Sequence, residues 1–429
     1  MYKLNLGSDL YIKGRIGWRG LSKDEYLEKS HYKIINATAL MDGYVDWDNC
    51  GYITQERYEE SEEIMLQEED LLISKDGTLG KIGYVKGLTI PCTVSSGIFV
   101  LRNTIPEILN FDYLYHVLKS YIFKDFINRN KSLGSTINHL YQRDLENFQL
   151  DLPNLDNQYK IANILNSIEN KISINNKINS ELESMAKTIY DYWFLQFEFP
   201  NEEGKPYKSS GGKMIWNEEL GREIPEGWGS ITLGEITNCY DSRRIPLSSK
   251  QRELKKGNIP YYGATGVMGY VDEAIFEGDF VLVAEDGSVM DENGNPLLQR
   301  VSGKAWVNNH AHVLQPSRNH SCKLLMMFLK DVSVNRIKTG SIQMKINQEN
   351  MNKIPVIDAP NNIINEINKY LINIENKILM YEKENYQLAS LRDFLLPLLM
   401  NGQVGFKENI SVKEIEIGSE EVVTSVNRK

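Results

Sequence analysis

The chain contains the same five residues twice, as Ile168-Glu169-Asn170-Lys171-Ile172 and, 206 positions later, as Ile374-Glu375-Asn376-Lys377-Ile378. Around each copy, alternating steps of four and three residues meet mainly apolar side chains. The first series is Ile161, Leu165, Ile168, Ile172, Asn175, Asn179, Leu182, Ala186, Ile189 and Trp193, and the second is Ile367, Leu371, Ile374, Ile378, Tyr381, Asn385, Leu388, Arg392, Leu395 and Leu399. This spacing is typical of the seam of a coiled coil.

Two copies in one phase indicate a duplication, whereas one copy alone would indicate an ordinary amphipathic core helix. We therefore predict two long, similar helices with a folded domain before each. Asn179 and Asn385 fall at equivalent seam positions. A polar asparagine there penalises wrong registers, although a partly exposed seam would also explain it.

Length and composition indicate an ordinary globular protein. With 429 residues, of which 41% are hydrophobic and 25% charged, the chain is long enough for two to four domains. The four cysteines, Cys50, Cys92, Cys239 and Cys322, form no CxxC pair, which argues against zinc and disulfides and for a reducing compartment. The N-terminus lacks the apolar core of a signal peptide, and no apolar run approaches a membrane span. We expect a soluble, cytoplasmic protein.

Acidic and basic residues are segregated along the chain, which has a net charge of −10. Residues 56–70 hold eight acids and one base, and residues 408–421 hold five acids and one base. Residues 241–260 hold six bases and two acids, and residues 116–144 hold five bases and two acids. Each run is consistent with a solvated face, so the pattern permits DNA binding without demonstrating it.

The first 152 residues predict a β-rich domain. The strand-like runs are 70–74, 82–85 and 97–101, followed by a helix over 113–128, a glycine-led loop at 134–138, a helical turn over 141–147 and a strand at 148–152. Pro153 marks a boundary. A helix of roughly 38 residues, ~57 Å long, follows it, with Asn154 or Asp156 as its N-cap.

Residues 200–227 are rich in Gly, Pro, Ser and charge and predict a linker, partly packed through Ile215 and Trp216. The first pattern then returns. Leu233-Gly234 repeats Leu6-Gly7, Asp286-Gly287 repeats Asp76-Gly77, residues 307–310 repeat 94–97, a helix over 323–338 precedes Gly340-Ser341, and Gln348 repeats Gln142. The expected segments are 1–152, 153–199, 200–227, 228–359, 360–402 and an acidic, disordered tail over 403–429.

Several of these features together resemble the specificity subunit of type I restriction-modification systems. They are Pro153, the helix start at 158–161, the paired IENKI segments, Tyr192-Trp193-Phe194, the run GREIPEGW at 221–228, and the ending LLPLLMNG at 395–402. The resemblance covers residues 1–402. It implies an α+β fold in which two mixed target-recognition domains are held apart by two long antiparallel coiled-coil helices, with a pseudo-two-fold internal repeat.

The resemblance also implies the function and the partners. The chain would read a bipartite site in double-stranded DNA and dock two modification (methyltransferase) subunits, with restriction subunits joining them. S-adenosylmethionine would belong to the modification subunit, and ATP with Mg to the restriction subunit. The positions assigned to the coiled coil and to subunit docking are Ile168, Ile172, Asn179, Leu182, Ile374, Ile378, Asn385 and Leu388.

Catalytic motifs are missing from the sequence. There is no phosphate-binding P-loop pattern, and Asn295-Pro296 is not followed by the second proline and aromatic residue of amino-methyltransferases. His310 and His312 alternate on an expected strand, which would place both on one face; base contacts or ordinary polar strand residues are favoured over a metal site. We predict no catalytic residue, no metal and no cofactor bound by this chain.

Candidate DNA-reading residues are loop residues with donors suited to guanine, amides suited to adenine, or aromatic and small polar groups. In the first domain they are Arg15, Trp18, Arg19, Lys75, Thr78, Lys81, Ser135, Thr136, Asn138 and His139. In the second domain they are Arg243, Arg244, Tyr261, Tyr262, Thr265, Asn308, Asn309, His310, Ser341, Gln343 and Lys345. Two alternatives stay open: a coiled-coil scaffold without DNA recognition, and a free-standing methyltransferase or nuclease.

Overall fold

The computed structural model describes residues 2–16, 20–41, 43–130, 139–339 and 344–400. The chain divides into two compact units. Unit 1 comprises Met1–Ser173 with Asn385–Lys429, and unit 2 comprises Ile174–Glu384. The predicted acidic tail over 403–429 lies outside the described residues.

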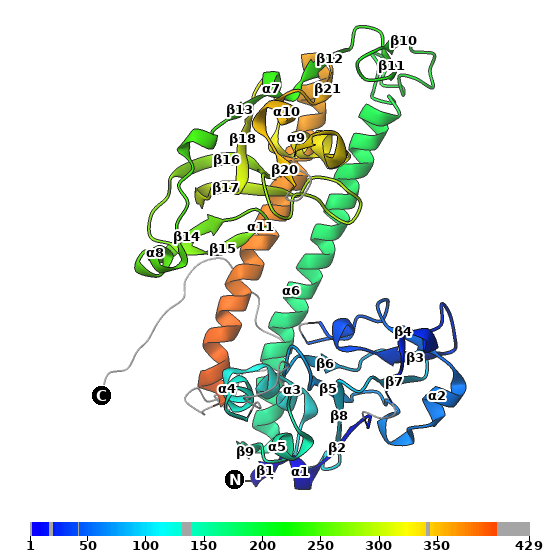
Figure 1. Ribbon diagram of the computed structural model, residues 1–429, viewed down its shortest axis with the longest axis vertical. Coiled ribbons are helices and arrows are strands. Elements are labelled where there is room, and N and C mark those ends of the chain that lie inside the picture. Colours follow the sequence, from blue (N-terminus) through cyan, green and yellow to red (C-terminus); the bar gives the residue numbers. More distant parts are fainter. Residues whose placement is uncertain (1, 17–19, 42, 131–138, 340–343, 401–429) are drawn as a thin grey trace. The chain divides into compact units, whose positions relative to one another are not determined.

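The duplicated segments form two long helices, α6 (Leu155–Tyr190) and α11 (Asn361–Met400) (Figure 1). All of the predicted seam positions on both helices are buried or half-buried, while most residues between them are exposed. The N-cap of α6 is Asn154, whose Oδ1 accepts a hydrogen bond from the Asn157 amide at 2.8 Å. Each helix contributes one part to each unit.

Within unit 2 the two helices run antiparallel. Asn175 donates to Glu384 Oε2 at 2.8 Å, and Asn179 donates to the carbonyl oxygen of Ile378 at 3.5 Å, so the numbers rise on α6 as they fall on α11. Asn179 therefore makes a polar contact across the seam, as expected of a residue that fixes register. The shorter contact is made by Asn175, which was not predicted to fix the register.

In unit 1, the first domain contains a four-stranded sheet in the order β2-β8-β5-β6 and a three-stranded sheet in the order β4-β3-β7. Their bounds are β2 (Leu10–Gly14), β8 (Ile98–Asn103), β5 (Leu71–Ser74), β6 (Ile82–Tyr84), β4 (Gly51–Ile53), β3 (Tyr32–Ile35) and β7 (Cys92–Val94). Strand β1 (Tyr2–Asn5) pairs with β9 (Gln149–Leu152), and the short helices α1 (Leu6–Asp9), α2 (Gln55–Glu59) and α5 (Gln142–Glu146) complete the domain. Its core continues onto the start of α6 through Ile161 and Leu165.

The helix predicted over 113–128 is two helices, α3 (Phe111–Lys119) and α4 (Tyr121–Asn130), which lie beside the four-stranded sheet (Figure 1). Ser120 separates them because its backbone is extended. Its Oγ donates to the Val117 carbonyl at 2.6 Å and accepts from the Ile122 amide at 3.2 Å, so one hydroxyl ends α3 and starts α4.

In unit 2, the second domain is built on a six-stranded sheet in the order β13-β18-β16-β17-β14-β15. The bounds are β13 (Thr237–Cys239), β18 (Ala311–Pro316), β16 (Phe276–Ala284), β17 (Leu298–Val307), β14 (Lys256–Tyr262) and β15 (Val267–Val271). Around it lie β12 (Gly229–Thr232) paired with β21 (Pro355–Asp358), β19 (Lys338–Thr339) paired with β20 (Lys345–Ile346), and helices α7 (Leu233–Ile236), α8 (Ser249–Leu254) and α10 (Gln348–Asn352). The helix predicted over 323–338 is shorter: α9 (Cys322–Lys330) has Asp331 as its C-cap.

The predicted linker over 200–227 folds. It contains the hairpin β10 (Met214–Asn217) and β11 (Arg222–Pro225). Ile215 and Trp216, expected to pack, are 38% and 59% exposed, so that expectation is wrong. Trp228 provides the packing instead, with ring centroids 4.9 Å from Phe199 and 5.4 Å from Phe194.

The two domains repeat each other in their hydrogen bonds. The Leu140 amide donates to the Lys75 carbonyl, and the Lys75 amide to the Gly97 carbonyl. In the second domain the Ile346 amide donates to the Glu285 carbonyl, and the Glu285 amide to the His310 carbonyl. The predicted repeat of Leu6-Gly7 as Leu233-Gly234 is confirmed in the same way, because the Leu6 amide meets the Phe148 carbonyl as Leu233 meets Ile354. The duplication therefore includes the domains as well as the helices.

No described helix has the length and apolar character to cross a membrane.

Candidate nucleic-acid interface

In the second domain, hydrogen bonds join the turn that carries Thr265 to a neighbouring predicted loop. Gln299 Nε2 donates to the carbonyl oxygens of Gly263 and Ala264 at 2.9 and 2.8 Å, which fixes the turn that carries Thr265. The Asn308 amide donates to the Tyr262 carbonyl at 3.1 Å. The turn is thereby attached to the strip Asn308–His310.

His310 connects this strip to the next two loops. Its Nδ1 lies 2.6 Å from Asp286 Oδ1, and Asp286 forms a β-bridge with Lys345. Thr265, Asn309, His310 and Lys345 are all exposed enough to meet a ligand. Tyr261 and Asn308 are buried and Tyr262 is half-buried, so these three side chains pack beneath the exposed residues of the surface.

The first domain has the same arrangement. His139 pairs with Asp76 through a hydrogen bond and a β-bridge, and Lys345 forms the equivalent β-bridge with Asp286. The Ser74 hydroxyl donates to the Thr78 carbonyl at 2.5 Å and accepts from the Lys81 amide at 2.9 Å, which presents Thr78 at an exposed tip. Lys75 is half-buried with its ammonium 4.7 Å from the Phe99 ring centroid, and burial lowers its pKa.

Arg15 does not belong to this surface. Its side chain is 1% exposed, with Nε 3.1 Å from the Val94 carbonyl and Nη1 3.9 Å from Glu60. Burial lowers its pKa, although Glu60 acts in the opposite direction. A guanidinium held inside the domain is unavailable to base edges, so we replace its predicted contact with DNA by a structural role.

Arg243 and Arg244 are also engaged within the protein. Arg243 donates to the Ile275 carbonyl at 2.8 Å and lies 4.9 Å from the Phe276 ring centroid. Arg244 is 12% exposed and donates to Glu285 at 2.5 Å and to the Ala311 carbonyl at 2.8 Å. Both hold the edge of the domain together, so a direct role in base reading is not supported by their contacts.

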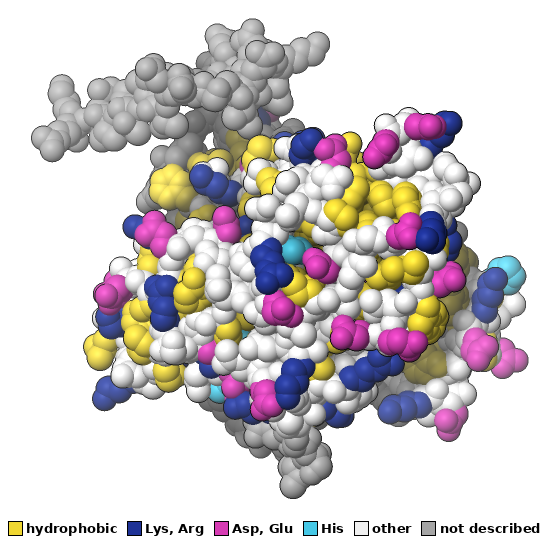
Figure 2. Space-filling view, turned by 90° about the horizontal axis from the view of Figure 1, so that it is seen from above, with side chains coloured by type: hydrophobic (Ala, Val, Ile, Leu, Met, Phe, Trp, Pro, Cys, Tyr) yellow, Lys and Arg dark blue, Asp and Glu magenta, His cyan; other side chains and the backbone are white. Residues whose placement is uncertain are grey.

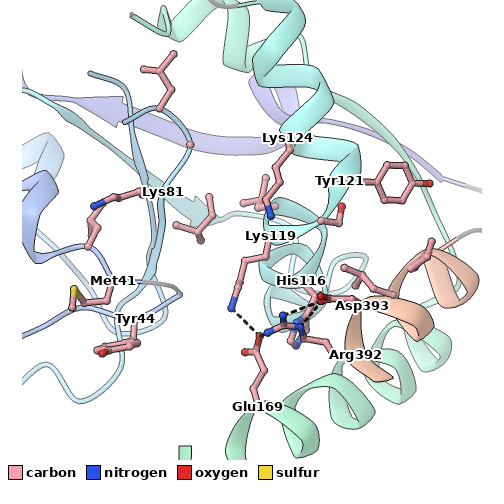
Figure 3. A pocket seen from close by; sticks show the side chains of 18 residues that line it. Met41, Tyr44, Lys81, His116, Lys119, Tyr121, Lys124, Glu169, Arg392 and Asp393 are labelled. Carbon is pink, nitrogen blue, oxygen red and sulfur yellow. Dashed lines mark hydrogen bonds and ion pairs between the residues drawn. The ribbon is translucent and has the colours of Figure 1, made fainter. Parts of the chain in front are cut away.

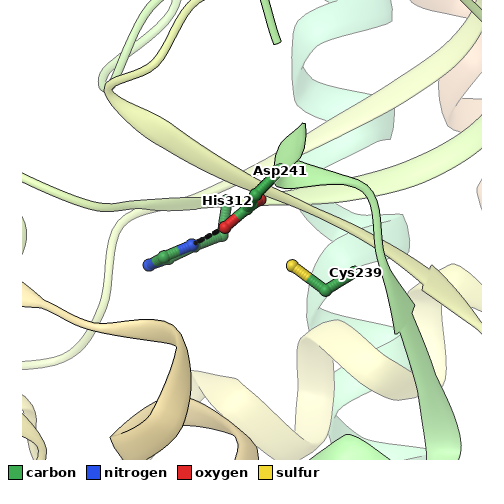
Figure 4. A group of neighbouring side chains, drawn as sticks. All are labelled: Cys239, Asp241 and His312. Atoms are coloured by element: carbon green, nitrogen blue, oxygen red, sulfur yellow. Dashed lines mark hydrogen bonds and ion pairs between the residues drawn. The ribbon is translucent and has the colours of Figure 1, made fainter. Parts of the chain in front are cut away.

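His310 and His312 do not share a face, contrary to the expectation. His310 lies in the exposed turn before β18, whereas His312 is buried, with Nδ1 2.5 Å from Asp241 and Nε2 2.8 Å from the Ile346 carbonyl. Cys239, Asp241 and His312 have the side chains of a metal site and lie close together (Figure 4).

Asp241 and His312 are already paired with other groups of the protein. Burial acts to raise the pKa of Asp241, but the hydrogen bonds from His312 and the Val313 amide outweigh it and lower that pKa. Burial raises the pKa of the Cys239 thiol to about 12. Arg244 already lies 3.5 Å from Asp241. The group is an ion-pair network in which each charge has an opposite partner. It holds strand β20, and with it Lys345, through the bond between His312 and the Ile346 carbonyl.

The reading loops of unit 1 adjoin a pocket of about 850 Å³ whose lining includes Lys81, Lys119, Lys124 and Glu169 (Figure 3). Glu169 accepts from Lys119 at 2.8 Å and from the Tyr115 hydroxyl at 2.9 Å, while Arg392 lies 3.8 Å away. Burial acts to raise the pKa of Glu169, but Lys119 and the other donors outweigh it and lower that pKa.

The second IENKI glutamate has the same role in unit 2. Glu375 Oε1 accepts from Arg300 Nε of β17 at 2.9 Å, and their side chains are 10% and 15% exposed. Glu169 joins the first domain to α6, and Glu375 joins the second domain to α11. The repeated pentapeptide thus carries an anchor as well as two seam positions.

Some predicted contacts lie outside the described residues: Trp18, Arg19, Ser135, Thr136, Asn138, Ser341 and Gln343. On the part of the described surface that Figure 2 shows, basic and acidic side chains are interspersed. The charge segregation seen along the sequence therefore does not produce one large basic area on that face.

Comparison with known families decides the kind of protein. The family model described as type I restriction modification DNA specificity domain matches residues 17–184 and again residues 225–390. The chain belongs to this specificity family. Each match covers most of one domain and most of the long helix that follows it.

The specificity chain is similar to whole proteins of this kind. It is 28% identical over 392 residues to the type I restriction enzyme MjaIX specificity subunit of Methanocaldococcus jannaschii, covering 85% of this chain and 86% of that one. It is 23% identical over 407 residues to the putative MjaX specificity subunit of the same organism, covering 90% and 91%. The crystal structure of a type I S subunit from M. genitalium matches in fold with a TM-score of 0.55 at 20% identity, covering 93% of this chain and 95% of that one.

Three features of the specificity chain were not predicted from its sequence. The first is the anchoring role of Glu169 and Glu375, which their shared position in the pentapeptide could have suggested. The second is the Asn175 contact with Glu384, which no local sequence pattern predicts. The third is the folded segment around Trp228, whose aromatic neighbours were visible in the sequence.

We expect unit 1 of the specificity chain to lose stability as the pH falls below about 6.5, the pKa of an unfolded histidine. His116 is 2% exposed, its Nε2 lies 2.8 Å from Asn166 Oδ1, and burial holds its pKa below the usual value. A lowered folded pKa stabilises the fold above the unfolded pKa, and that contribution is lost as the pH falls through the folded pKa. Melting temperatures measured from pH 7.5 to 5.0 test this.

His116→Gln is the matched control for this measurement, because glutamine does not titrate in that range. Its melting temperature should fall less between pH 7.5 and 5.0 than that of the wild type. An identical fall in both proteins would contradict the role given to His116.

Proposed function

We propose that this chain is the non-catalytic specificity subunit of a type I restriction-modification complex and that it reads a bipartite site in double-stranded DNA. Each domain reads one half-site, and the paired helices set the gap between them. The observation that carries this proposal is the repeated loop arrangement, in which Asp76 with His139 and Asp286 with Lys345 present equivalent surfaces. Two equivalent surfaces with different side chains suit two different half-sites.

The chemistry of these loops fits DNA. Thr78, Thr265, Asn309 and His310 offer donors, acceptors and methyl groups that can meet base edges in a groove. Lys81 adds positive charge, which supports backbone contacts. Lys345 pairs with Glu285 at 2.8 Å, but its side chain is 50% exposed, unlike that of Arg244, so its ammonium can also meet a phosphate. The carboxylate of Asp286 orients His310 and leaves its second ring nitrogen for a ligand.

The helices suit the docking of modification subunits. In unit 2 they expose Ile174, Met185 and Met380 at 52%, 52% and 54%. In unit 1 they expose Tyr386 and Phe394 at 62% and 65%. These exposed apolar side chains are available to pack against a partner subunit. We propose two modification subunits there, with restriction subunits joining the complex.

The chemical steps would belong to those partners. S-adenosylmethionine would bind the modification subunit, which methylates a base taken out of the duplex. ATP and Mg would bind the restriction subunit. We place the complex in the cytoplasm, where the free thiols of this chain would stay reduced.

Salt-dependent binding tests the proposal that the chain, assembled with its modification subunits, holds DNA through these loops. Affinity for duplex should fall steeply as salt rises, with a linear dependence of log K on log salt. The double variant Lys81→Ala with Lys345→Ala should weaken binding and lower the slope by up to about 2, one unit for each phosphate that is no longer neutralised.

Lys208→Ala with Lys353→Ala serves as the matched control, because these lysines are exposed and belong to none of the reading loops. The control should bind as the wild type does. Binding that does not depend on salt would overturn the proposal and favour a scaffold without DNA recognition.

A further inference from the structure

A turn in the first domain has the same place in the fold as the Thr265 turn of the second. In the first domain β3 pairs in parallel with β7 and matches Ile35 with Val94; in the second, β14 pairs in parallel with β17 and matches Tyr262 with Val307. The next hydrogen bond is also shared. The Ser95 amide donates to the Ile35 carbonyl at 2.9 Å, as Asn308 does to Tyr262 at 3.1 Å.

This register aligns Asn36-Ala37-Thr38-Ala39 with Gly263-Ala264-Thr265-Gly266. Thr38 and Thr265 therefore occupy equivalent positions, and both are exposed. Ala37 matches Ala264 as well. The shared Ala-Thr pair is too short to detect in the sequence without the strand pairing.

Both turns are fixed by side chains of their own domain. Gln299 holds the second turn through the carbonyl oxygens of Gly263 and Ala264. In the first domain the Tyr26 hydroxyl lies 3.0 Å from Asn36 Oδ1, and residues 37–39 form a 3₁₀ turn. A rigid turn can present one side chain in a defined direction, which base reading requires.

The two turns also lie next to the residues already placed on the reading surface. The second turn is bonded to Asn308, two residues before His310. The first turn follows Ile35, whose carbonyl oxygen accepts from the Ser95 amide. Ser95 lies two residues before Gly97, whose carbonyl oxygen accepts from the Lys75 amide. Thr38 is thus connected to the Lys75–Thr78 loop as Thr265 is connected to His310 and Asp286.

The turns differ at their first residue. Asn36 in the first domain corresponds to Gly263 in the second, where a Cβ would lie 2.4 Å from Met268 Sδ. Met268 therefore fills the space into which a side chain at 263 would extend, and it is 56% exposed. The first domain presents an amide beside its threonine, and the second presents a thioether.

We propose that these two turns are equivalent base-contacting elements, that Thr38 and Thr265 each contact one half-site of the DNA, and that Asn36 and Met268 give the two contacts different preferences. An amide can bond to adenine and a thioether can contact the thymine methyl group. A threonine can bond through its hydroxyl and touch a thymine through its methyl group. The inference rests on the proposed DNA-reading function and assigns residues to it.

Thr38→Val and Thr265→Val test the inference, because valine keeps the shape of threonine and removes the hydroxyl. Each variant is assembled with its modification subunit, and methylation of a random-sequence duplex library is measured by single-molecule sequencing. Thr38→Val should lower the discrimination between bases about fivefold at one base pair of one half-site. This is the change expected for the loss of one hydrogen bond. Thr265→Val should do so only in the other half-site.

Two further variants test the difference between the turns. Asn36→Ala should relax the half-site that Thr38→Val affects, and Met268→Ala should relax the half-site that Thr265→Val affects. Thr89→Val is the matched control, because Thr89 is exposed in another turn of the first domain. Its motif should equal that of the wild type.

The outcomes separate this inference from the proposed function. A wild-type chain that directs no bipartite methylation would refute the proposed function itself. A bipartite wild-type motif that stays unchanged in Thr38→Val and Thr265→Val, with melting temperatures equal to the wild type, would overturn the inference alone. Both threonine variants relaxing the same half-site would also overturn it.

Discussion

Replacing Trp228 with alanine is expected to lower the free energy of unfolding of unit 2 by about 3–5 kcal/mol, the usual cost of truncating a buried aromatic side chain. Trp228 is 7% exposed and packs against Phe194, Phe197 and Phe199, with ring centroids 5.4, 5.7 and 4.9 Å away. These rings connect the end of α6 to the second domain. Truncation would leave a cavity at that connection.

Trp216→Ala is the control that the same segment offers. Trp216 is 59% exposed on the β10–β11 hairpin, so its removal should change stability by no more than about 0.5 kcal/mol. Denaturant unfolding followed by circular dichroism measures both variants. Equal losses in the two would show that the packing of residues 194–228 has been misassigned.

Replacing Glu375 with alanine is expected to cost about 3 kcal/mol, because it leaves the guanidinium of Arg300 buried without its main partner. The two side chains are 10% and 15% exposed, and their atoms lie 2.9 Å apart. Burial acts to lower the pKa of Arg300, but the hydrogen bonds to Glu375 and Asp279, together with the charges around the guanidinium, outweigh it and raise that pKa. The remaining carboxylate partner of Arg300 among the described residues, Asp279, is 62% exposed and compensates weakly.

The matched control is Glu349→Ala. Glu349 pairs with Lys353 at 2.6 Å, but the two side chains are 75% and 68% exposed, and such surface pairs contribute about 0–1 kcal/mol. A double-mutant cycle with Arg300→Met then isolates the pair. A loss for Glu375→Ala no larger than that for Glu349→Ala would contradict its role as an anchor between domain and helix.

The helices were the most predictable part of the fold. A seam repeats its signal over many turns, so the positions from Ile161 to Trp193 could be assigned from the sequence alone, and all of them are buried or half-buried. The break at Ser120 was not predictable in the same way. Its flanks continue the apolar spacing, and one hydroxyl decides the interruption.

The candidate surface was predictable only in part. Glycine-containing turns such as Asp76-Gly77 and Asp286-Gly287 have strong local signals, and the structure places them in equivalent loops. Arg15 looked like a loop arginine because burial depends on distant strands, here β7 through Val94. Thr38 was missed for the same reason, since its equivalence with Thr265 appears only in the parallel pairing with β7.

The most direct test of the account is the methylation pattern that the wild-type chain directs when it is assembled with its modification subunit. Random duplex DNA is treated with the complex and sequenced as single molecules. We predict one bipartite motif, with two specified half-sites separated by a fixed number of unspecified base pairs. A single continuous motif, or no sequence preference at all, would contradict it.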